Sequence, residues 1–256
     1  MHIYNRIIPV LLLDNKGLYK TINFKNPTYI GDPINAVKIF NEKEVDEIVI
    51  LDITATSDKK PIQYEFIRDI VSEAFMPICY GGGINNISQI KKILNIGIEK
   101  VAINSCAIEN PSFINEVSNI YGSSTIVVSV DVKRNIFGKY FIYNNRGRFN
   151  TGNNPIIFCK NVEKMGAGEI ILTSINNEGM RRGYDLVLLK KITEAVSIPV
   201  IANGGAGCID DFNKAINIGG ASAVSAGSLF VYKGNNKAIL INYPDQQQIE
   251  KIMETQ

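Results

Sequence analysis

Histidine is nearly absent from this chain. His2 is the single histidine among 256 residues, and it lies at the extreme N-terminus. This isolation excludes catalysis by a histidine-based triad and argues against zinc, which is held by histidine and cysteine side chains in groups. Any proton transfer must therefore use carboxylate, lysine or tyrosine side chains. We expect no metal ion and no cofactor.

Paired cysteines and long apolar runs are also missing. The four cysteines (Cys79, Cys106, Cys159 and Cys208) form no CxxC pair and lie in or beside apolar segments, which indicates free thiols in a reducing compartment. No apolar run is long enough to span a bilayer. The N-terminal MHIYNRIIPV lacks a basic region before an apolar one and a cleavage site, so it is not a signal peptide. These features predict a cytoplasmic protein.

The chain carries no large excess of charge. Its net charge is +2, which gives no reason to expect nucleic acid or a membrane surface as the main partner. Apolar residues make up 45% and charged residues 20%, as in ordinary globular proteins. The length suffices for one domain, because a single α/β barrel typically runs to about 250 residues.

Two glycine-rich stretches repeat at a fixed distance. Residues 76–83 read MPICYGGG and residues 198–205 read IPVIANGG, so that Gly205 follows Gly83 by 122 positions (205 minus 83). The same offset relates Glu47 to Glu169, each of which opens an apolar segment. Short strands that end in glycine look alike in any α/β protein, which explains each match but not the shared offset. The repeat predicts two half-barrels, about 1–122 and 123–245.

Apolar segments alternate with helical patterns along the chain. The predicted strands cover 6–13, 47–53, 77–80, 100–104, 125–131, 169–174, 198–203 and 222–226. The helices between them are predicted near 32–44, 61–74, 87–94, 111–120, 155–165, 185–196 and 210–218, and a closing helix near 245–254. This order predicts a single (β/α)8 TIM barrel. A doubly wound sheet is the alternative, but it would usually show GxGxxG after an early strand.

Two segments lengthen the connections between these elements. Residues 14–31 form a polar stretch of 18 residues, which we expect to be a loop that closes over a substrate. In residues 137–149, aromatic and polar side chains alternate on both sides of the polar sequence NNRG (144–147), which predicts a β-hairpin.

The active site of such a barrel lies at the carboxyl ends of its strands. Glycines and small polar residues cluster there in both halves and leave backbone N–H groups uncovered, as a phosphate site requires. The candidate phosphate and substrate residues are Asp52, Gly82, Gly83, Asn104, Ser105, Thr173, Glu178, Asn203, Gly204, Gly205, Gly227 and Ser228. Glycines that serve only tight turns are the alternative. Two symmetric clusters favour a substrate with a phosphate at each end.

Charged residues mark both ends of the predicted strands. Asp131 ends an apolar strand, where a carboxylate is costly unless it works as a general acid or base. Lys20, in the 14–31 stretch, either closes over the substrate or is solvated. At the opposite end, Arg6, Glu47, Lys100 and Glu169 open four strands. By themselves they indicate a structural plug of ion pairs.

Together these residues resemble the HisF family, the cyclase subunits of imidazole glycerol phosphate synthase. The shared motifs are RIIP (6–9), INFKN (22–26), GDP (31–33), DEIVILDITA (46–55), GGGI (81–84), KVAINS (100–105), ENPSFI (109–114), VSVDVKR (128–134), NTG (150–152), GAGEIILTSI (166–175), GYD (183–185), IPVIANGGAG (198–207) and AGSLF (226–230). The resemblance implies a two-half barrel whose bottom face binds a glutaminase subunit. It also implies that Arg6, Glu47, Lys100 and Glu169 gate ammonia, which then meets a bis-phosphorylated ribotide at the top.

The chain departs from the family at a catalytic position. The resemblance implies aspartates at the ends of strands one and five; Asp131 matches the second, but Leu12 stands at the first. Asp14 is a displaced candidate two residues further along, and Glu178 stands where the family has aspartate.

The ending KGNNKAILINYP (233–244) resembles paralogues that work with a glutaminase and a sugar amidotransferase to install acetamidino groups on surface-polysaccharide or nonulosonic-acid sugars. We therefore expect a subunit that supplies ammonia for such an amidation. A cyclase that makes imidazole glycerol phosphate, and a scaffold that only activates the glutaminase, are the alternatives.

Overall fold

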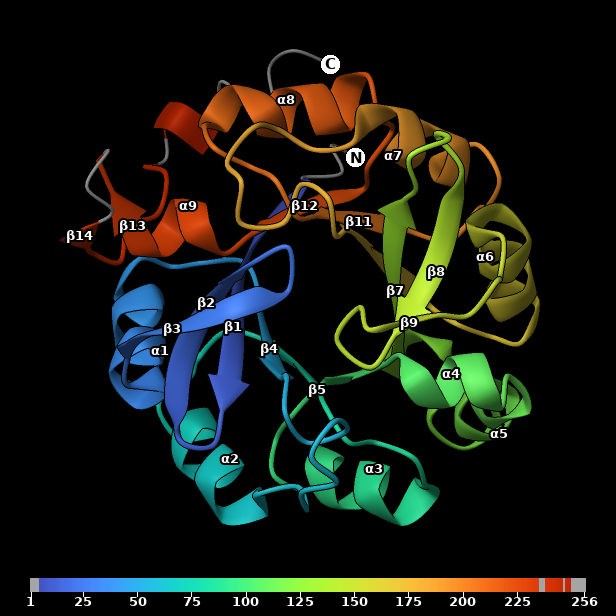
Figure 1. Ribbon diagram of the computed structural model, residues 1–256. Helices are drawn as coiled ribbons and strands as arrows, with labels where there is room; N and C mark the ends of the chain where they lie inside the picture. The colour runs from blue at the N-terminus through green and yellow to red at the C-terminus, as the bar shows by residue number, and fades with distance from the viewer. Residues whose placement is uncertain (1–4, 235–237, 246, 250–256) are drawn as a thin grey trace.

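Eight parallel strands close into a barrel in the computed structural model, which describes residues 5–234, 238–245 and 247–249 (Figure 1). The barrel strands are β1 (Arg6–Asp14), β4 (Ile48–Asp52), β5 (Ile78–Gly81), β6 (Lys100–Ile103), β7 (Ile126–Arg134), β10 (Glu169–Ser174), β11 (Val200–Asn203) and β12 (Ala223–Ala226). Each strand pairs with its neighbours in this order, β1 pairs with β12, and β10 pairs with β7, so no barrel strand has a free edge. The predicted TIM barrel is confirmed.

Helices surround the barrel on its outside (Figure 1). They are α1 (Pro33–Glu42), α2 (Tyr64–Val71), α3 (Ile87–Leu94), α4 (Ser105–Glu109), α5 (Ser112–Tyr121), α6 (Pro155–Lys164), α7 (Leu186–Thr193), α8 (Ile209–Asn217) and α9 (Ser228–Val231), with a 3-10 turn at Ser123–Thr125. Local chemistry sets their starts: the Asp32 carboxylate caps α1 by accepting from the Asn35 N–H at 2.8 Å, and Pro33 is the first helical residue. The short α4 and α9 were not predicted, because four or five residues carry no helical periodicity.

The 14–31 segment is a β-hairpin, so the prediction of a loop was wrong. Its strands β2 (Gly17–Ile22) and β3 (Lys25–Gly31) pair with each other, and β2 extends β1 in antiparallel register. Most of β3 is exposed, so its sequence lacks the alternation of apolar and polar residues that marks a strand. Asn23 and Phe24 have positive φ at the turn.

A second hairpin follows β7, as predicted. Strand β8 (Tyr140–Asn144) pairs with β7 and with the short β9 (Phe149–Asn150), and the turn between β8 and β9 carries Asn145 and Arg146. Both hairpins project from the carboxyl ends of the barrel strands (Figure 1). They therefore flank the barrel mouth.

Two apolar clusters form the core. The larger one lies between strands and helices, and the smaller one fills the inside of the barrel. In β1, Ile8, Val10 and Leu12 point inward, whereas Leu11 and Leu13 pack outward, which explains why the segment is apolar throughout.

The C-terminal segment returns to the barrel. Strands β13 (Tyr232–Lys233) and β14 (Ala238–Ile239) pair, and the Tyr243 hydroxyl donates to the Ile7 carbonyl at 2.8 Å. Most of the predicted closing helix (245–254) lies outside the described residues, as does His2, and only 247–249 are seen as helical. Within the described part of the chain, no helix has the length and apolar character to cross a membrane. The division into half-barrels stays a prediction.

Candidate functional site

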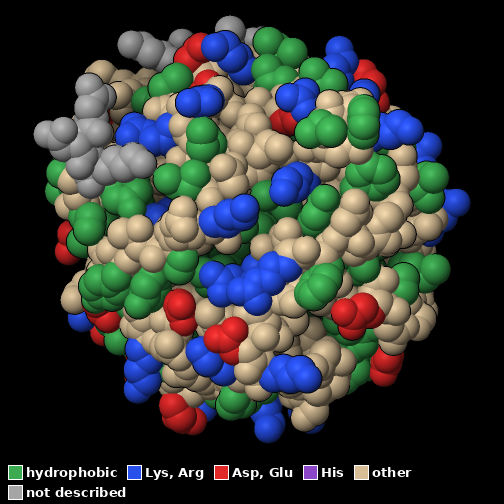
Figure 2. Space-filling model, in the orientation of Figure 1, with side chains coloured by type: hydrophobic (Ala, Val, Ile, Leu, Met, Phe, Trp, Pro, Cys, Tyr) green, Lys and Arg blue, Asp and Glu red, His purple; other side chains and the backbone are tan. Residues whose placement is uncertain are grey.

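A cavity of about 660 Å³ opens at the carboxyl ends of the strands. Figure 2 looks onto this face, where lysine and arginine side chains gather near the centre. The predicted residues that line it are Lys20, Asp52, Gly82, Gly83, Asn104, Ser105, Asp131, Thr173, Glu178, Asn203, Gly204, Gly205, Gly227 and Ser228. Residues up to 208 positions apart (228 minus 20) thus meet at one mouth. This is the candidate active site.

Asp131 lies on β7 and keeps partial exposure to the cavity. Its Oδ2 accepts from the Asn104 side-chain amide at 3.1 Å, and that amide also donates to the Ser129 carbonyl at 2.9 Å. Burial, which removes water from around the carboxylate, raises the pKa of Asp131 to about 7. A hydrogen bond from Thr173 opposes this shift, and the negative charge of Glu178 adds to it. A carboxyl that titrates near neutrality can both give and take a proton, as an acid–base catalyst must.

Lys20 is buried rather than solvated, although it lies on the β2–β3 hairpin. Its ammonium donates to the Val10 carbonyl at 3.2 Å and fills the space beside Gly227, where an added Cβ would lie 1.8 Å from Nζ. Burial lowers the pKa of Lys20 to about 8, and the charge of Glu178 opposes this change. The hairpin thus places a cation inside the mouth of the barrel.

Two predicted glycines are required by close backbone approaches. Gly82 has φ of +127°, and a Cβ there would lie 2.6 Å from the Asp52 carbonyl oxygen. Gly205 has φ of +126°, and a Cβ would lie 2.2 Å from the Gly183 carbonyl oxygen. Tight packing alone therefore accounts for these two glycines, and phosphate binding at the clusters stays a prediction.

Two predicted carboxylates are used mainly in the protein's own loops. The Asp52 Oδ1 accepts from the backbone N–H groups of Thr54 and Ala55, both at 2.9 Å. Glu178 is buried and ties down the β2–β3 hairpin: its oxygens accept from the Thr21 hydroxyl and the Phe24 N–H, both at 3.0 Å. Burial raises the pKa of Glu178, although these bonds and Lys20 oppose the shift.

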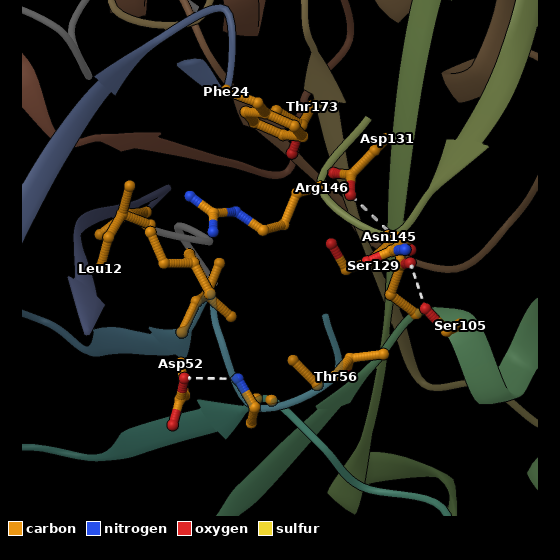
Figure 3. Close-up of a pocket in the computed structure, with 18 of the residues that line it drawn as sticks. Leu12, Phe24, Asp52, Thr56, Ser105, Ser129, Asp131, Asn145, Arg146 and Thr173 are labelled. Carbon is orange, nitrogen blue, oxygen red and sulfur yellow. Dashed lines mark hydrogen bonds between the residues drawn. The ribbon is translucent and has the colours of Figure 1, made fainter. Parts of the chain in front are cut away.

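Leu12 lines the cavity at the end of β1 (Figure 3). Asp14 is not among the residues that line it; this residue pairs with Gly17 at the start of the hairpin, and its Oδ1 accepts from the Asn15 amide at 3.1 Å. The structure therefore does not bring Asp14 to the site. The β1 side of the cavity is apolar where the family resemblance implies an aspartate.

Sequence reasoning missed several lining residues. Arg146 and Asn145 enter from the β8–β9 turn, Lys59 and Lys60 from the loop after β4, and Phe24 from the β2–β3 turn. All five lie outside the barrel strands. The one signal in the sequence was NNRG itself, which was interpreted only as a turn.

The four charged residues at the amino ends of the strands form a closed ring, here called the charged ring. Arg6 donates to the carboxylates of Glu47 and Glu169, and Lys100 contacts the same two carboxylates, each at 3.0 Å. The Glu47 side chain is 3% exposed, and its Oε1 is buried without a hydrogen-bond partner in the described part of the molecule. The ring of ion pairs is confirmed, and its use as a gate stays a prediction.

Apolar side chains connect the charged ring to the cavity. They are Ile8, Val10, Val49, Cys79, Ala102, Val127, Ile171, Ile201 and Ala223, with Leu12 and Leu51 packed above them. Burial raises the pKa of the Cys79 thiol, so it stays neutral. The four cysteines are unpaired, and among the described residues no three metal-ligating side chains gather.

Comparison with known proteins places the chain in a family. A family model described as "Histidine biosynthesis protein" matches residues 6–237, which include the charged ring and every cavity residue. The chain belongs to this family. It is a HisF-like barrel, and the match extends from the first barrel strand, β1, to beyond the last barrel strand, β12.

Individual relatives match over almost their whole lengths. A protein of Leptospira interrogans, provisionally named imidazole glycerol phosphate synthase subunit HisF, is 45% identical over 248 residues, covering 96% of this chain and 98% of its own. A Pseudomonas aeruginosa protein, provisionally named imidazole glycerol phosphate synthase subunit hisF2, is 43% identical over 245 residues, with the same coverage. Imidazole glycerol phosphate synthase subunit HisF of Alkaliphilus metalliredigens is 41% identical over 230 residues, 90% of this chain and 91% of its own.

Proposed function

We propose that this HisF-like barrel takes ammonia from a glutaminase subunit at its bottom face and supplies it for a sugar amidation. The product would carry an acetamidino group, as in surface-polysaccharide or nonulosonic-acid sugars, and a sugar amidotransferase would be a further partner. The observation that carries the proposal is Leu12 in the cavity wall above an intact charged ring. One end of the barrel keeps what the ammonia route needs, and the other has lost half of the family's acid–base pair.

The route itself has a physical basis. The inside of the barrel is apolar from Ile8 to Leu12, so neutral ammonia can cross it at far lower cost than the ammonium ion. At the entrance, Glu47 Oε1 is a buried acceptor without a protein donor among the described residues. An entering ammonia molecule can donate to this oxygen while Arg6 and Lys100 hold the rest of the ring in place.

Asp131 also supports a cyclase, which is the second candidate function. Its pKa near 7, its bond from Asn104 and its place in the cavity suit a general acid or base. In that case Asp131 would act without a second aspartate, since Leu12 has no proton to give and Asp14 does not line the cavity.

Ammonium-dependent turnover of the histidine-pathway ribotide tests the proposal without any glutaminase. We expect no imidazole glycerol phosphate from the unmodified protein. Leu12→Asp restores a carboxylate opposite Asp131 and is expected to yield product. Leu51→Asp is the matched control, because Leu51 pairs with Leu12 on the neighbouring strand and lines the same cavity, and this variant should stay inactive.

Turnover by the unmodified protein at ordinary enzyme rates would establish the cyclase instead. An amidation assay distinguishes the proposed function from the alternative of a non-catalytic scaffold. The assay contains the protein, the glutaminase, the sugar amidotransferase and nitrogen-15-labelled glutamine. Label should reach the sugar, and Glu47→Gln should reduce its transfer. If a variant altered at Asp131 transferred as much label to the sugar as the unmodified protein, the scaffold alternative would be favoured.

A further inference from the structure

The β8–β9 turn places an arginine in the middle of the cavity. Arg146 lines the cavity, is partly buried, and points across it toward the side on which Leu12 lies (Figure 3). Among the described residues, none accepts a hydrogen bond or forms an ion pair with its guanidinium. A guanidinium carries five donors in a planar fork that matches carboxylate or phosphate oxygens. Its donors are therefore free for a ligand.

The turn holds this arginine in an uncommon backbone conformation. Asn145, Arg146 and Gly147 have φ values of +47°, +58° and +70°. The left-handed region suits glycine and asparagine but is unfavourable for a long side chain such as arginine, and such strain persists where function requires it. A glycine at position 146 would relieve the strain but would remove the guanidinium. The turn therefore keeps a guanidinium at this position at a backbone cost that glycine would avoid.

Contacts from other loops fix where the turn points. A Cβ on Gly147 would lie 3.2 Å from Ile175 Cδ1 and 3.2 Å from Phe24 Cδ2, so the turn is packed between the segment after β10 and the β2–β3 hairpin. Within the turn, the Arg148 N–H donates to the Asn144 carbonyl at 3.2 Å. Arg146 is thus held over the cavity by its own turn and by two other loops.

Three carboxylates that line the cavity accept bonds from groups other than this guanidinium. Asp52 accepts from its own loop, Glu178 from the β2–β3 hairpin and Asp131 from Asn104. The opposite wall offers Leu12. Arg146 does influence Asp58, whose pKa is lowered chiefly by bonds from Ser57 and Lys60 and only slightly by Arg146. That carboxylate is exposed and paired with Lys60 at 3.1 Å.

A neighbouring side chain supplies a second unmatched group. The Oδ1 of Asn145 is buried and has no hydrogen-bond partner among the described residues. Leaving a buried acceptor unpaired is costly, so such an oxygen calls for an N–H or O–H donor. Asn145 also lines the cavity. The turn thus offers an anion-binding fork beside an acceptor.

We propose that Arg146 is a specificity residue that binds an anionic oxygen group of the substrate, a carboxylate or a phosphate, in the middle of the cavity, while Asn145 accepts from an adjacent hydroxyl or N–H. The substrate would then carry a charged group there in addition to any phosphate held at the glycine clusters. This inference rests on the proposed function, because it assumes that a phosphorylated sugar occupies the cavity.

Three probes with the same ring separate the contributions. Glucose 1-phosphate has a neutral group at carbon 6, glucuronate 1-phosphate has a carboxylate there, and glucose 1,6-bisphosphate has a phosphate. We expect calorimetry to show one of the two charged probes binding at least about tenfold more tightly than glucose 1-phosphate, since a charge-assisted bond contributes that much. The probe with the larger gain identifies the anion.

Variants of the turn connect that gain to one side chain. Arg146→Gln should remove the preference for the charged probe and leave the affinity for glucose 1-phosphate within about twofold. Arg146→Lys should keep part of the preference for the charged probe, because lysine retains the positive charge but lacks the planar guanidinium with its paired donors. Arg148→Gln is the matched control: it removes the same charge from the same turn, but Arg148 is exposed and does not line the cavity, so the preference should persist. A melting curve of each variant confirms folding.

Two results would overturn the inference, and they differ in what else they affect. If glucose 1-phosphate binds but neither charged probe gains affinity, or if Arg148→Gln loses as much as Arg146→Gln, Arg146 does not bind the substrate and the proposed function stands. If none of the three probes binds, the phosphate clusters of the proposed function fail as well.

Discussion

At the bottom of the barrel, Arg6 and Lys100 each contact both Glu47 and Glu169, whereas at the top Arg146 has no acceptor among the described residues. Lys20, also at the top, donates to the backbone carbonyl of Val10 and has no other hydrogen-bond acceptor in the part of the chain that the structure describes. The charges of the ring are matched inside the protein. Lys20 and Arg146, which line the cavity, have no ion-pair partner among the described residues, and we expect a ligand to compensate the cost of holding their charges there.

The same contrast appears in the pKa values. Burial moves the pKa of Asp131 to about 7 and that of Lys20 to about 8, so both groups titrate near physiological pH. In the charged ring, by contrast, the two carboxylates raise the pKa of Arg6 against the opposing effect of burial, so its charge is secured. Arg6 at the bottom of the barrel therefore stays charged, whereas Asp131 and Lys20 at the top can gain or lose a proton near physiological pH.

The largest effect is expected from breaking the charged ring. Glu47→Ala leaves Arg6 and Lys100 with one carboxylate between them, and removing one partner of a buried ion pair costs about 4 kcal/mol. Urea unfolding measures the loss. Glu65→Ala is the control, because its pair with Arg68 is exposed and should contribute less than about 1 kcal/mol. Equal losses in both variants would remove the distinction between matched and surface charges.

A smaller, pH-dependent effect is expected at the top. The folded-state pKa of Asp131 lies above the ordinary value of 3.8, so the folded chain binds this proton more tightly than the unfolded chain. The resulting stabilisation is full below about pH 4 and is lost as the pH rises through about 7. Asp131→Asn carries no charge, so its stability relative to the unmodified protein should rise between pH 4 and pH 8. The rise should be about 2 kcal/mol, because solvent in the open cavity screens part of the full effect.

Urea unfolding at both pH values measures this change. Asp69→Asn, on an exposed position of α2, is the control and should show no such trend. A constant difference between Asp131→Asn and the unmodified protein across this range would show that the carboxyl is not held in an unfavourable environment.

The smallest effect concerns the turn that carries Arg146. Arg146→Gly relieves a left-handed residue and should stabilise the fold by about 1 kcal/mol while it abolishes the preference for a charged probe. Arg148→Gly is the comparison, because Arg148 is not left-handed and a glycine there only adds freedom to the unfolded chain, which should destabilise the fold slightly. A loss of stability with Arg146→Gly would mean that the side chain supports the structure rather than a ligand.

The barrel and its charged ring were predictable because both depend on local patterns. Each barrel strand is a largely apolar run. Arg6, Lys100 and Glu169 are the first residues of β1, β6 and β10, so closing the sheet brings them together. Asp131 was predictable for the same reason, since it lies on a barrel strand just past an apolar run. The 14–31 hairpin was missed because β3 is exposed and lacks alternation.

The sequence by itself determined the eight strands and the ring at their amino ends, because these follow from the order and spacing of residues along the chain. The absence of an aspartate at Leu12 is what the resemblance to the HisF family implies. Only the tertiary structure decided that Lys20 is buried against Gly227, that Asp14 stays outside the cavity and that Arg146 reaches into it. These placements depend on packing between loops far apart in sequence, such as Gly147 against Phe24 and Ile175. No periodicity encodes such contacts, so side chains on loops take their directions from the folded barrel.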